Sequence, residues 1–186
     1  MNAMRFFREL PFSRPFWMTI LLGSLGAEAV AICFQYLLHE DPCAICVQIR
    51  ALVMLIGLTG LLGLMLPRQS KRWQLLPHAL LLLSLLKVAA LSSKAVLIEQ
   101  GRIFATCGMD AGFPKWLALD SWLPAVFAPT GLCGKAIAMI PGWQAGPTMS
   151  ESLYMGSVTL FLVVALMLIE SFVLHLRGSF SNSSNQ

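Results

Sequence analysis

Four long apolar runs constrain this chain more than any other feature of its sequence. They extend over residues 15–38, 46–66, 75–98 and 153–176. A helix needs about 20 residues to cross the roughly 30 Å of hydrocarbon in a bilayer, and each run is long enough. The sequence therefore predicts an all-α membrane protein built as a four-transmembrane-helix bundle.

The composition agrees with a single membrane domain over residues 1–186. Hydrophobic residues make up 57% of the chain, the mean hydropathy is +0.73, and charged residues account for 12%. Short segments, 39–45 and 67–74, are predicted to join the first three runs, and a long polar and aromatic loop, 99–152, precedes the fourth. The Ser/Asn-rich end, residues 178–186, is predicted to be a disordered tail.

Lysine and arginine residues near the ends of the runs predict the side that each loop faces. Cytoplasmic loops of membrane proteins carry an excess of these residues. Seven lie on the side of the two chain ends and of loop 67–74, and three lie in the other loops: Arg5, Arg8, Arg14, Arg68, Lys71, Arg72 and Arg177 against Arg102, Lys115 and Lys135. Both termini are thus predicted to be cytoplasmic, with loops 39–45 and 99–152 outside. This asymmetry accounts for the net charge of +4, and no nucleic-acid partner is expected.

The long outer loop contains a short apolar stripe at helical spacing. Trp116, Leu119 and Leu123 form it, with Trp122 and Phe127 nearby. This pattern predicts a short interfacial helix that rests on the bilayer surface. The alternative is that the stripe packs against the bundle.

Four of the five cysteines lie in the two outer loops, on the oxidising side of the membrane. Cys43 and Cys46 form a C-x-x-C pair, and a disulfide across two residues constrains little chain, so this pair is predicted to be a redox couple rather than a staple. A disulfide between Cys107 and Cys133 would suit either role. Cys33, within the first run, is predicted to be a buried and inert thiol.

The spacing of the cysteines does not favour a metal. A zinc site of four cysteines would need a second closely spaced pair, and Cys107 and Cys133 are far apart in the sequence. Covalent haem attachment would need a histidine directly after Cys46, where Val47 stands. No metal ligand is therefore assigned.

Three charged residues lie within the apolar runs, where each is expected to need an opposite charge or a polar contact. Arg50 follows Cys46 by one helical turn on the same face, which predicts that it favours the thiolate of Cys46. The alternative is that Arg50 reaches to lipid headgroups. Glu28 and Lys87 lie at similar depths counted from the cytoplasmic side, so an intramembrane ion pair or a shared polar network is predicted, because a lone charge in lipid is costly.

From Glu28 through the fourth run, the chain resembles a known family, the bacterial inner-membrane disulfide bond formation protein DsbB and its close relative DsbI. The order of the cysteines separates this family from relatives of vitamin K epoxide reductase, in which the C-x-x-C pair follows the loop cysteines. The resemblance is carried by Glu28, Phe34-Gln35, Pro42-Cys43-x-x-Cys46, Arg50, Phe104-Ala-Thr-Cys107, Phe113-Pro-x-Trp-Leu-x-Leu-Asp120, Trp122, Pro124, Val126-Phe127 and Gly131-x-Cys133.

The resemblance implies a quinone-dependent thiol oxidase in the bacterial inner membrane, with its redox loops in the periplasm. By similarity, a reduced DsbA-like periplasmic partner attacks the Cys107–Cys133 disulfide and forms a transient mixed disulfide through Cys107. Cys133 or the partner then exchanges with Cys43–Cys46, and ubiquinone or menaquinone reoxidises that pair. All four cysteines are thus expected to be catalytic.

The resemblance also implies that Cys46 and Arg50 contact the quinone. The chain departs from the family pattern at Val47-Gln48-Ile49, where many relatives carry an aromatic residue and then Gln or Glu before the arginine. It departs again at Lys94, where some members have a quinone-holding histidine. Lys94 is predicted to bind the quinone in its place, or else to reach to the headgroups. The competing hypothesis is a nonenzymatic four-span membrane scaffold with static disulfides.

Overall fold

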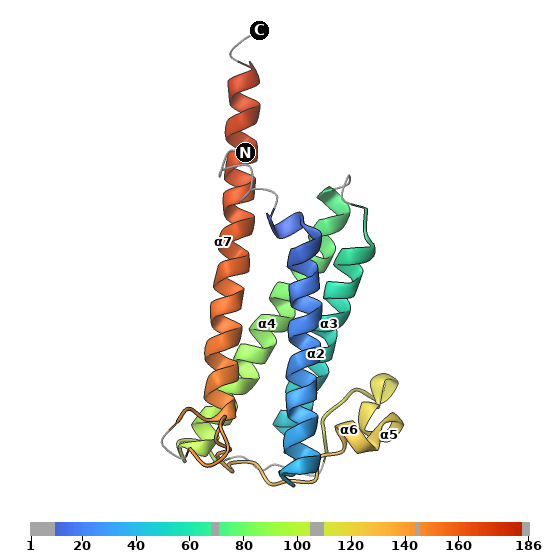
Figure 1. Cartoon of the computed structure of the whole chain (residues 1–186), viewed down its shortest axis with the longest axis vertical. Helices are drawn as coiled ribbons and strands as arrows, with labels where there is room; N and C mark the ends of the chain where they lie inside the picture. Colours follow the sequence, from blue (N-terminus) through green and yellow to red (C-terminus); the bar gives the residue numbers. More distant parts are fainter. Residues whose placement is uncertain (1–9, 68–70, 105–109, 144–145, 184–186) are drawn as a thin grey trace.

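Four long helices form the body of the protein in a computed structural model that describes residues 10–67, 71–104, 110–143 and 146–183. They are α2 (Arg14–Leu37), α3 (Ala44–Met65), α4 (Lys71–Glu99) and α7 (Met149–Ser183), as Figure 1 shows. Each contains a segment that is long and apolar enough to cross a membrane. The prediction of an all-α protein with four membrane-spanning helices is confirmed.

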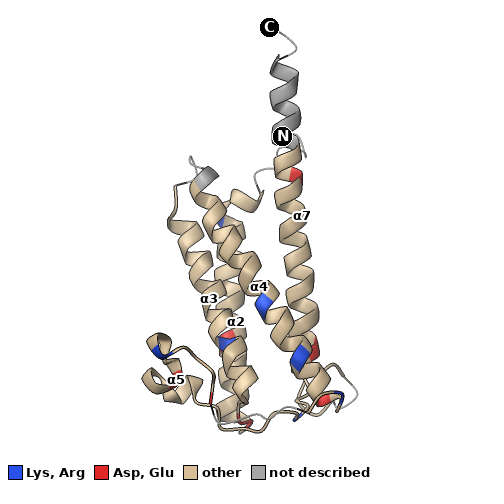
Figure 2. Ribbon diagram, turned by 180° about the vertical axis from the view of Figure 1, so that it is seen from behind, with Lys and Arg blue, Asp and Glu red and all other residues tan. Residues whose placement is uncertain are grey.

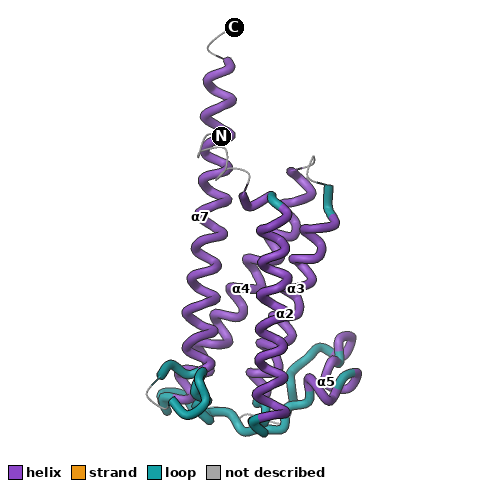
Figure 3. The backbone as a smooth tube through the Cα atoms, viewed as in Figure 1, coloured by secondary structure: helices purple, strands orange, loops and turns teal. Residues whose placement is uncertain are grey.

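The loops that carry the cysteines lie at one end of the bundle, where α2 ends and α3 begins (Figure 3). This end is called the cysteine end below. Charged residues are sparse along the long helices and gather mostly toward the cysteine end (Figure 2). The start of α2 and the end of α7 lie at the opposite end (Figure 1).

The shorter elements are η1 (Leu10–Phe12), η2 (Lys115–Leu117), α5 (Leu119–Trp122) and α6 (Pro124–Phe127). The last three replace the single interfacial helix that the sequence predicts. Pro124, which lacks the N–H that a continuous helix would use, separates α5 from α6. Phe127 is buried against α3, whereas Trp116 and Trp122 are 75% and 61% exposed. The predicted stripe is therefore divided between the bundle and the outer surface.

The order of packing in the bundle is α2 on α3, α3 on α4, and α4 on α7. Over the described residues, α2 and α7 scarcely contact each other. A core of buried apolar side chains runs between the packed helices and includes Trp17, Ile56, Leu85 and Val164. The bundle is therefore a row of helices rather than a closed ring.

Glycines on α3 allow α2 to approach closely. A Cβ atom added at Gly60 would lie 2.9 Å from the backbone nitrogen of Leu21, and one at Gly63 would lie 2.2 Å from the Trp17 ring. Lipid does not drive apolar helix surfaces together, so close contact between small residues supplies much of the attraction between membrane helices. The α2–α3 interface thus depends on these positions having no side chain.

The fourth long helix differs from its predicted extent. α7 begins at Met149 rather than at 153, and it continues to Ser183 instead of giving way to a tail at 178. Each residue added to an existing helix gains one hydrogen bond, whereas Gly178 costs about 1 kcal/mol and the Ser and Asn residues after it cost less. Residues 184–186 of the predicted tail lie outside the described residues.

Replacing Gly60 with alanine is expected to weaken the α2–α3 interface. The new methyl group would meet the backbone of α2, which cannot rotate away, so the free energy of unfolding should fall by about 1 to 3 kcal/mol. Equilibrium unfolding in detergent micelles would measure this. Gly23→Ala is the matched control, since nothing lies within 4 Å of its added Cβ. Equal stability of the two variants would contradict the close-packing argument.

Candidate functional site

Cys43 and Cys46 meet at the start of α3. Cys43 is the N-cap of this helix, and its Sγ accepts a hydrogen bond from the backbone N–H of Cys46 at 3.3 Å. The two sulfur atoms lie 2.7 Å apart, in hydrogen-bond contact, and both thiols are free. One turn of helix thus brings the C-x-x-C pair together as a dithiol.

The two thiols of this pair are not equivalent. With Cys46 as the hydrogen-bond donor, this contact lowers the pKa of Cys43 from 9.0 to about 7. Burial of Cys43 acts in the opposite direction, while the backbone N–H groups at the start of α3 lower the pKa further. Cys43 is therefore the sulfur that ionises near neutral pH.

The second cysteine loop is held against the first. The backbone N–H groups of Thr130 and Gly131 both donate to the carbonyl oxygen of Pro42 at 3.0 Å, and Thr130 Oγ1 donates to Asp41 Oδ1 at 3.1 Å. A Cβ atom at Gly131 would lie 2.2 Å from the Asp41 carbonyl oxygen, so only glycine permits this approach. These contacts position the segment that leads into Cys133.

Cys133 is disulfide-bonded and half-buried. Its predicted partner, Cys107, lies outside the described residues, so the predicted pairing stays a prediction. Just beyond it, Lys135 forms an ion pair with Glu40 in the first loop. The disulfide-bonded sulfur and the free dithiol are thus brought to the same end of the bundle by contacts on both sides of Cys133.

A cavity of about 290 Å³ connects these groups. It lies between α2 and the start of α7, where those helices scarcely contact each other, and residues of α3, α4 and the loop after Leu132 complete its wall. Its walls are mainly apolar. The chemically reactive or charged residues around it include Glu28, Cys43, Cys46, Arg50, Glu99 and Cys133.

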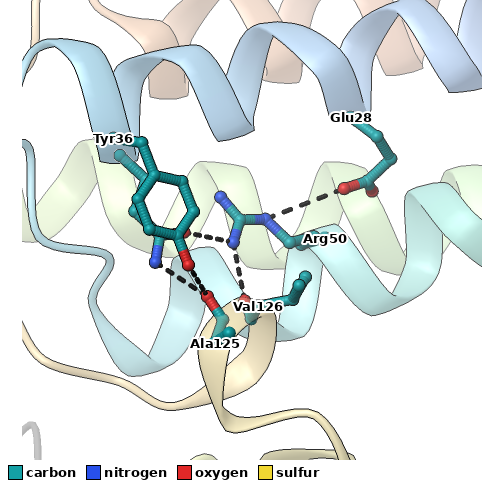
Figure 4. Close-up of polar contacts among 6 residues, drawn as sticks. Glu28, Tyr36, Arg50, Ala125 and Val126 are labelled. Atoms are coloured by element: carbon teal, nitrogen blue, oxygen red, sulfur yellow. Dashed lines mark hydrogen bonds and ion pairs between the residues drawn. The ribbon is translucent and has the colours of Figure 1, made fainter.

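Arg50 lies beside this cavity with its charge almost wholly buried, since only 6% of its side chain is exposed. Nη1 donates to Gln35 Oε1 at 2.7 Å and to the carbonyl oxygen of Val126 at 2.6 Å. Nε lies 3.7 Å from Glu28 Oε2 (Figure 4). Arg50 follows Cys46 on α3 as predicted, but these three groups, rather than the Cys46 sulfur, are the polar contacts of its guanidinium.

The predicted ion pair between Glu28 and Lys87 is wrong, because Glu28 pairs with Arg50. Helix order explains the difference. α2 packs on α3, whereas Lys87 belongs to α4 and is exposed on its surface. Equal depth in the membrane allows a pair only between neighbouring helices.

Lys94, the other predicted quinone contact, is also exposed on α4 and is not among the cavity residues. Its neighbours Ala95 and Ile98 do line the cavity. The structure therefore brings Cys43, Cys46, Arg50 and Cys133 together and leaves Lys94 outside. Cys33, predicted to be buried, is exposed on α2.

Polar side chains to which the sequence interpretation assigned no contact attach the long loop to the bundle. Tyr36 OH and Gln35 Nε2 donate to the carbonyl oxygen of Ala125 at 2.7 and 3.1 Å (Figure 4). Gln48 Nε2 donates to the carbonyl oxygen of Ala111 at 2.7 Å. Gln35 and Gln48 each lie within a membrane-spanning helix, and a polar side chain at such a position is the signal that could have identified them.

Comparison with known families decides the classification. The sequence profile described as "Disulfide bond formation protein DsbB" matches residues 13–170. This chain belongs to the DsbB family.

Individual relatives in the DsbB family match over most of their length. "Disulfide bond formation protein B" of Shewanella loihica is 34% identical over 165 residues, which cover 83% of this chain and 92% of the relative. The protein of the same description from Photorhabdus laumondii is 31% identical over 171 residues, with 91% and 97% covered. "Disulfide bond formation protein B 2" of Pseudomonas aeruginosa is 31% identical, with 84% and 88% covered. Together with the four apolar helices, this membership makes the chain a multi-pass membrane protein.

The low pKa of Cys43 predicts the pH dependence of its alkylation. A thiol reacts as the thiolate, so in the reduced protein the rate of reaction with iodoacetamide should rise through a midpoint near pH 7 instead of pH 9. Cys46→Ala removes the hydrogen bond and should move the midpoint upward. Mass spectrometry of the Cys43 peptide gives the rate, and Cys33→Ala is the control that should leave it unchanged. An identical midpoint with and without Cys46 would contradict this role of the hydrogen bond.

The buried contact between Arg50 and Glu28 predicts a large loss of stability when one partner is removed. Arg50→Met leaves Glu28 without its cation and should lower the free energy of unfolding by about 3 to 5 kcal/mol. Adding Glu28→Gln to that variant should cost less than Glu28→Gln alone, because the two residues are coupled. Unfolding in micelles measures both effects. As a control, Lys135→Met, which breaks an exposed ion pair, should lower the free energy of unfolding by less than about 1 kcal/mol. Strictly additive effects of Arg50→Met and Glu28→Gln would contradict the coupling.

Proposed function

We propose that this chain is a quinone-dependent thiol:disulfide oxidoreductase. It reoxidises a periplasmic DsbA-like dithiol oxidase and passes the electrons to a membrane quinone. The observation that carries the proposal is that one cavity is lined both by the free dithiol, Cys43 and Cys46, and by the disulfide-bonded Cys133. The description of its relatives as disulfide bond formation proteins supports a role in making disulfides.

The first half of the reaction is an exchange with the partner protein. A thiolate of the reduced partner attacks Cys107 in the predicted Cys107–Cys133 disulfide, which forms a mixed disulfide and releases the Cys133 thiolate. The partner's second thiol then displaces Cys107, so the partner leaves oxidised and the pair is left as two thiols. This exchange consumes one disulfide and makes one, without net electron loss.

The second half restores the disulfide of the long loop. The Cys133 thiolate attacks the oxidised Cys43–Cys46 pair, and Cys107 resolves the bond between the loops. Cys43 and Cys46 are left as the dithiol that the structure contains. A low pKa suits Cys43 to this step, because a more acidic thiol is a better leaving group in exchange.

The cavity residues fit the head group of a quinone. About 290 Å³ is near the lower end of the range for small-molecule sites and is mainly apolar, which suits a planar ring. Within the described residues, the hydrogen bonds of Arg50 all leave from Nη1, so the two N–H groups on Nη2 stay available to a carbonyl oxygen (Figure 4). Cys46 and Arg50 would hold the ring, which, when bound, accepts the two electrons and two protons of the dithiol.

The position of the cavity supports entry from the bilayer. It lies where α2 and α7 scarcely contact each other, and both helices expose large apolar side chains such as Leu25 and Leu162. A lipid-soluble molecule could therefore reach Cys46 from the side without crossing the polar loops. We assign no quinone contact to Lys94, which stays a prediction from the resemblance.

The proposed orientation places the cysteine end in the periplasm and both termini in the cytoplasm, in a bacterial inner membrane. The excess of Lys and Arg in the sequence segments before the first apolar run, between the second and third, and after the fourth supports it, because such residues stay in the cytoplasm. The periplasm is an oxidising compartment, which the chemistry of the cysteines requires.

The proposal predicts that the purified protein oxidises a reduced DsbA-like partner only when a quinone is present. Replacing Cys43, Cys46, Cys107 or Cys133 with alanine should reduce turnover to the uncatalysed background, since each cysteine takes part in a bond that is exchanged. Cys33→Ala should keep full activity. Absorbance of the quinone and free-thiol counts on the partner measure the two ends of the reaction. If the purified protein does not oxidise the partner, and no cysteine replacement changes the quinone absorbance or the free-thiol count, the hypothesis of a nonenzymatic scaffold with static disulfides remains.

A further inference from the structure

A second cavity lies at the end of the bundle opposite the cysteines. It has a volume of about 360 Å³ and is formed where α2 begins and α3 ends (Figure 1). The apolar segment of α2 that can cross a membrane begins at Arg14, that of α3 ends at Met65, and both of these residues line the cavity. The cavity therefore lies where the membrane spans end, which is the level of the lipid headgroups.

A fixed turn of the chain forms one wall of this cavity. The turn is η1, and it is closed by two hydrogen bonds to the carbonyl oxygen of Leu10, from Ser13 N at 3.0 Å and from Ser13 Oγ at 2.6 Å. Nε2 of His78 on α4 donates to the carbonyl oxygen of Pro11 at 3.0 Å, which attaches the turn to the bundle. Phe12, which lines the cavity, is therefore held in place.

Arg14 supplies the charge of the cavity. Of the described residues that line it, Arg14 alone has an ionisable side chain, and its guanidinium has no hydrogen bond or ion pair to any of them. Arg14 is also the first residue of α2, where the partial positive charge of the helix start disfavours a cation, and no acidic residue lies in the first turn. The guanidinium and the helix start together therefore favour an anion as ligand.

Two polar groups of residues in the wall lack a hydrogen-bond partner. The carbonyl oxygen of Gly63 would accept from residue 67 in a continuing helix, but α3 ends at Met65 and Pro67 has no N–H. The side chain of Trp17 is 1% exposed, and its indole N–H has no partner within the described part of the chain. A ligand that both accepts and donates hydrogen bonds could satisfy such groups, which are costly when left unpaired.

The rest of the wall is apolar. Leu64, Met65 and Leu66 at the end of α3 lie on one side, and Phe12 lies on the other. A small soluble anion would gain nothing from these side chains, whereas the glycerol backbone and first methylene groups of a phospholipid would be removed from water against them. A cation at headgroup level with apolar surface beside it therefore fits the phosphate of a lipid.

We propose that this cavity binds the headgroup of an anionic phospholipid of the phosphatidylglycerol type. Arg14 pairs with the phosphate, and a glycerol hydroxyl of the headgroup donates to the carbonyl oxygen of Gly63. A zwitterionic headgroup fits less well, because its ammonium group would share the cavity with the guanidinium and with no carboxylate from the described residues of the wall. The bound lipid joins the start of α2 to the end of α3. This site is separate from the cysteine end and does not depend on the proposed redox function.

Lipid binding by the purified full-length protein tests the proposal. Native mass spectrometry from neutral detergent micelles should show that the protein retains phosphatidylglycerol more tightly than phosphatidylethanolamine. Arg14→Gln should weaken the binding of phosphatidylglycerol by about tenfold, because one charge-assisted contact is lost, and Arg14→Lys should keep part of it. Arg102→Gln is the matched control, since it makes the same change at an exposed arginine in the outer loop, and it should leave binding unaltered. Equal retention of the two lipids, or equal retention by wild type and Arg14→Gln, would overturn the proposal.

A soluble competitor separates a lipid from a free phosphate compound. Glycerol 3-phosphate carries the phosphate without the acyl chains, and at equal concentration it should not displace phosphatidylglycerol. Displacement would assign the cavity to a soluble anion and would contradict the choice of a lipid.

A second pair of variants covers the case in which Arg14→Gln does not fold. Met65 lines the cavity and is 76% exposed, so Met65→Glu adds a carboxylate to the wall without disturbing the core. It should abolish the binding of phosphatidylglycerol, while Met65→Gln, of the same size and without charge, should keep most of it. Equal binding by these two variants would exclude this cavity as the site.

Binding also predicts that the stability of the protein depends on the lipid. A ligand that binds only the folded state stabilises it by mass action. The unfolding temperature of the wild-type protein in micelles should therefore rise as phosphatidylglycerol is added, and that of Arg14→Gln should rise less at the same concentrations. A rise of the same size in both proteins would mean that the lipid acts elsewhere and would count against the proposal.

Discussion

The buried guanidinium of Arg50 is the interaction on which the geometry of the cysteine end depends. An arginine that is 6% exposed cannot lose its charge, so the surrounding chain has to supply acceptors for it. Three groups from two other elements supply them: Glu28 and Gln35 from α2, and the carbonyl oxygen of Val126 from α6. The need to satisfy one cation therefore joins two membrane helices and the long loop at a fixed distance from Cys46.

Cys43 combines structural and chemical roles in one sulfur atom. It caps α3, so the same hydrogen bonds that begin the helix also lower the pKa of the thiol. A serine or aspartate would cap the helix as well, but neither could form a disulfide. The loop contacts of Pro42 and Asp41 with Thr130 and Gly131 then bring the second cysteine segment to this capped end.

The long helices could be predicted from the sequence because hydropathy is a local property. The C-x-x-C pair could be predicted because the spacing of two cysteines is also local. The partner of Glu28 could not, since it depends on which helices are neighbours. Depth counted from the cysteine end would have been a better guide: Glu28 lies about 13 Å from the end of α2 and Arg50 about 9 Å from the start of α3, at about 1.5 Å per residue.

The departure from the family pattern at Val47 and Gln48 also has a local explanation, since Val47 is buried against Phe127 and Gln48 binds the backbone of the loop. Cys107, outside the described residues, and Lys94 remain predictions from resemblance.

The arrangement of the four helices as an open row has a consequence for molecular recognition. A closed bundle would have to enclose a whole ligand, but a cavity between two helices that scarcely contact each other needs to enclose only its reactive head. Under the proposed function, the long hydrocarbon tail of a quinone would stay in the lipid beside α2 and α7. Selection among membrane quinones would then depend on the substituents and potential of the ring, and tail length would contribute little. Bacteria that differ only in the tail length of their quinones could therefore use this fold without altering its walls.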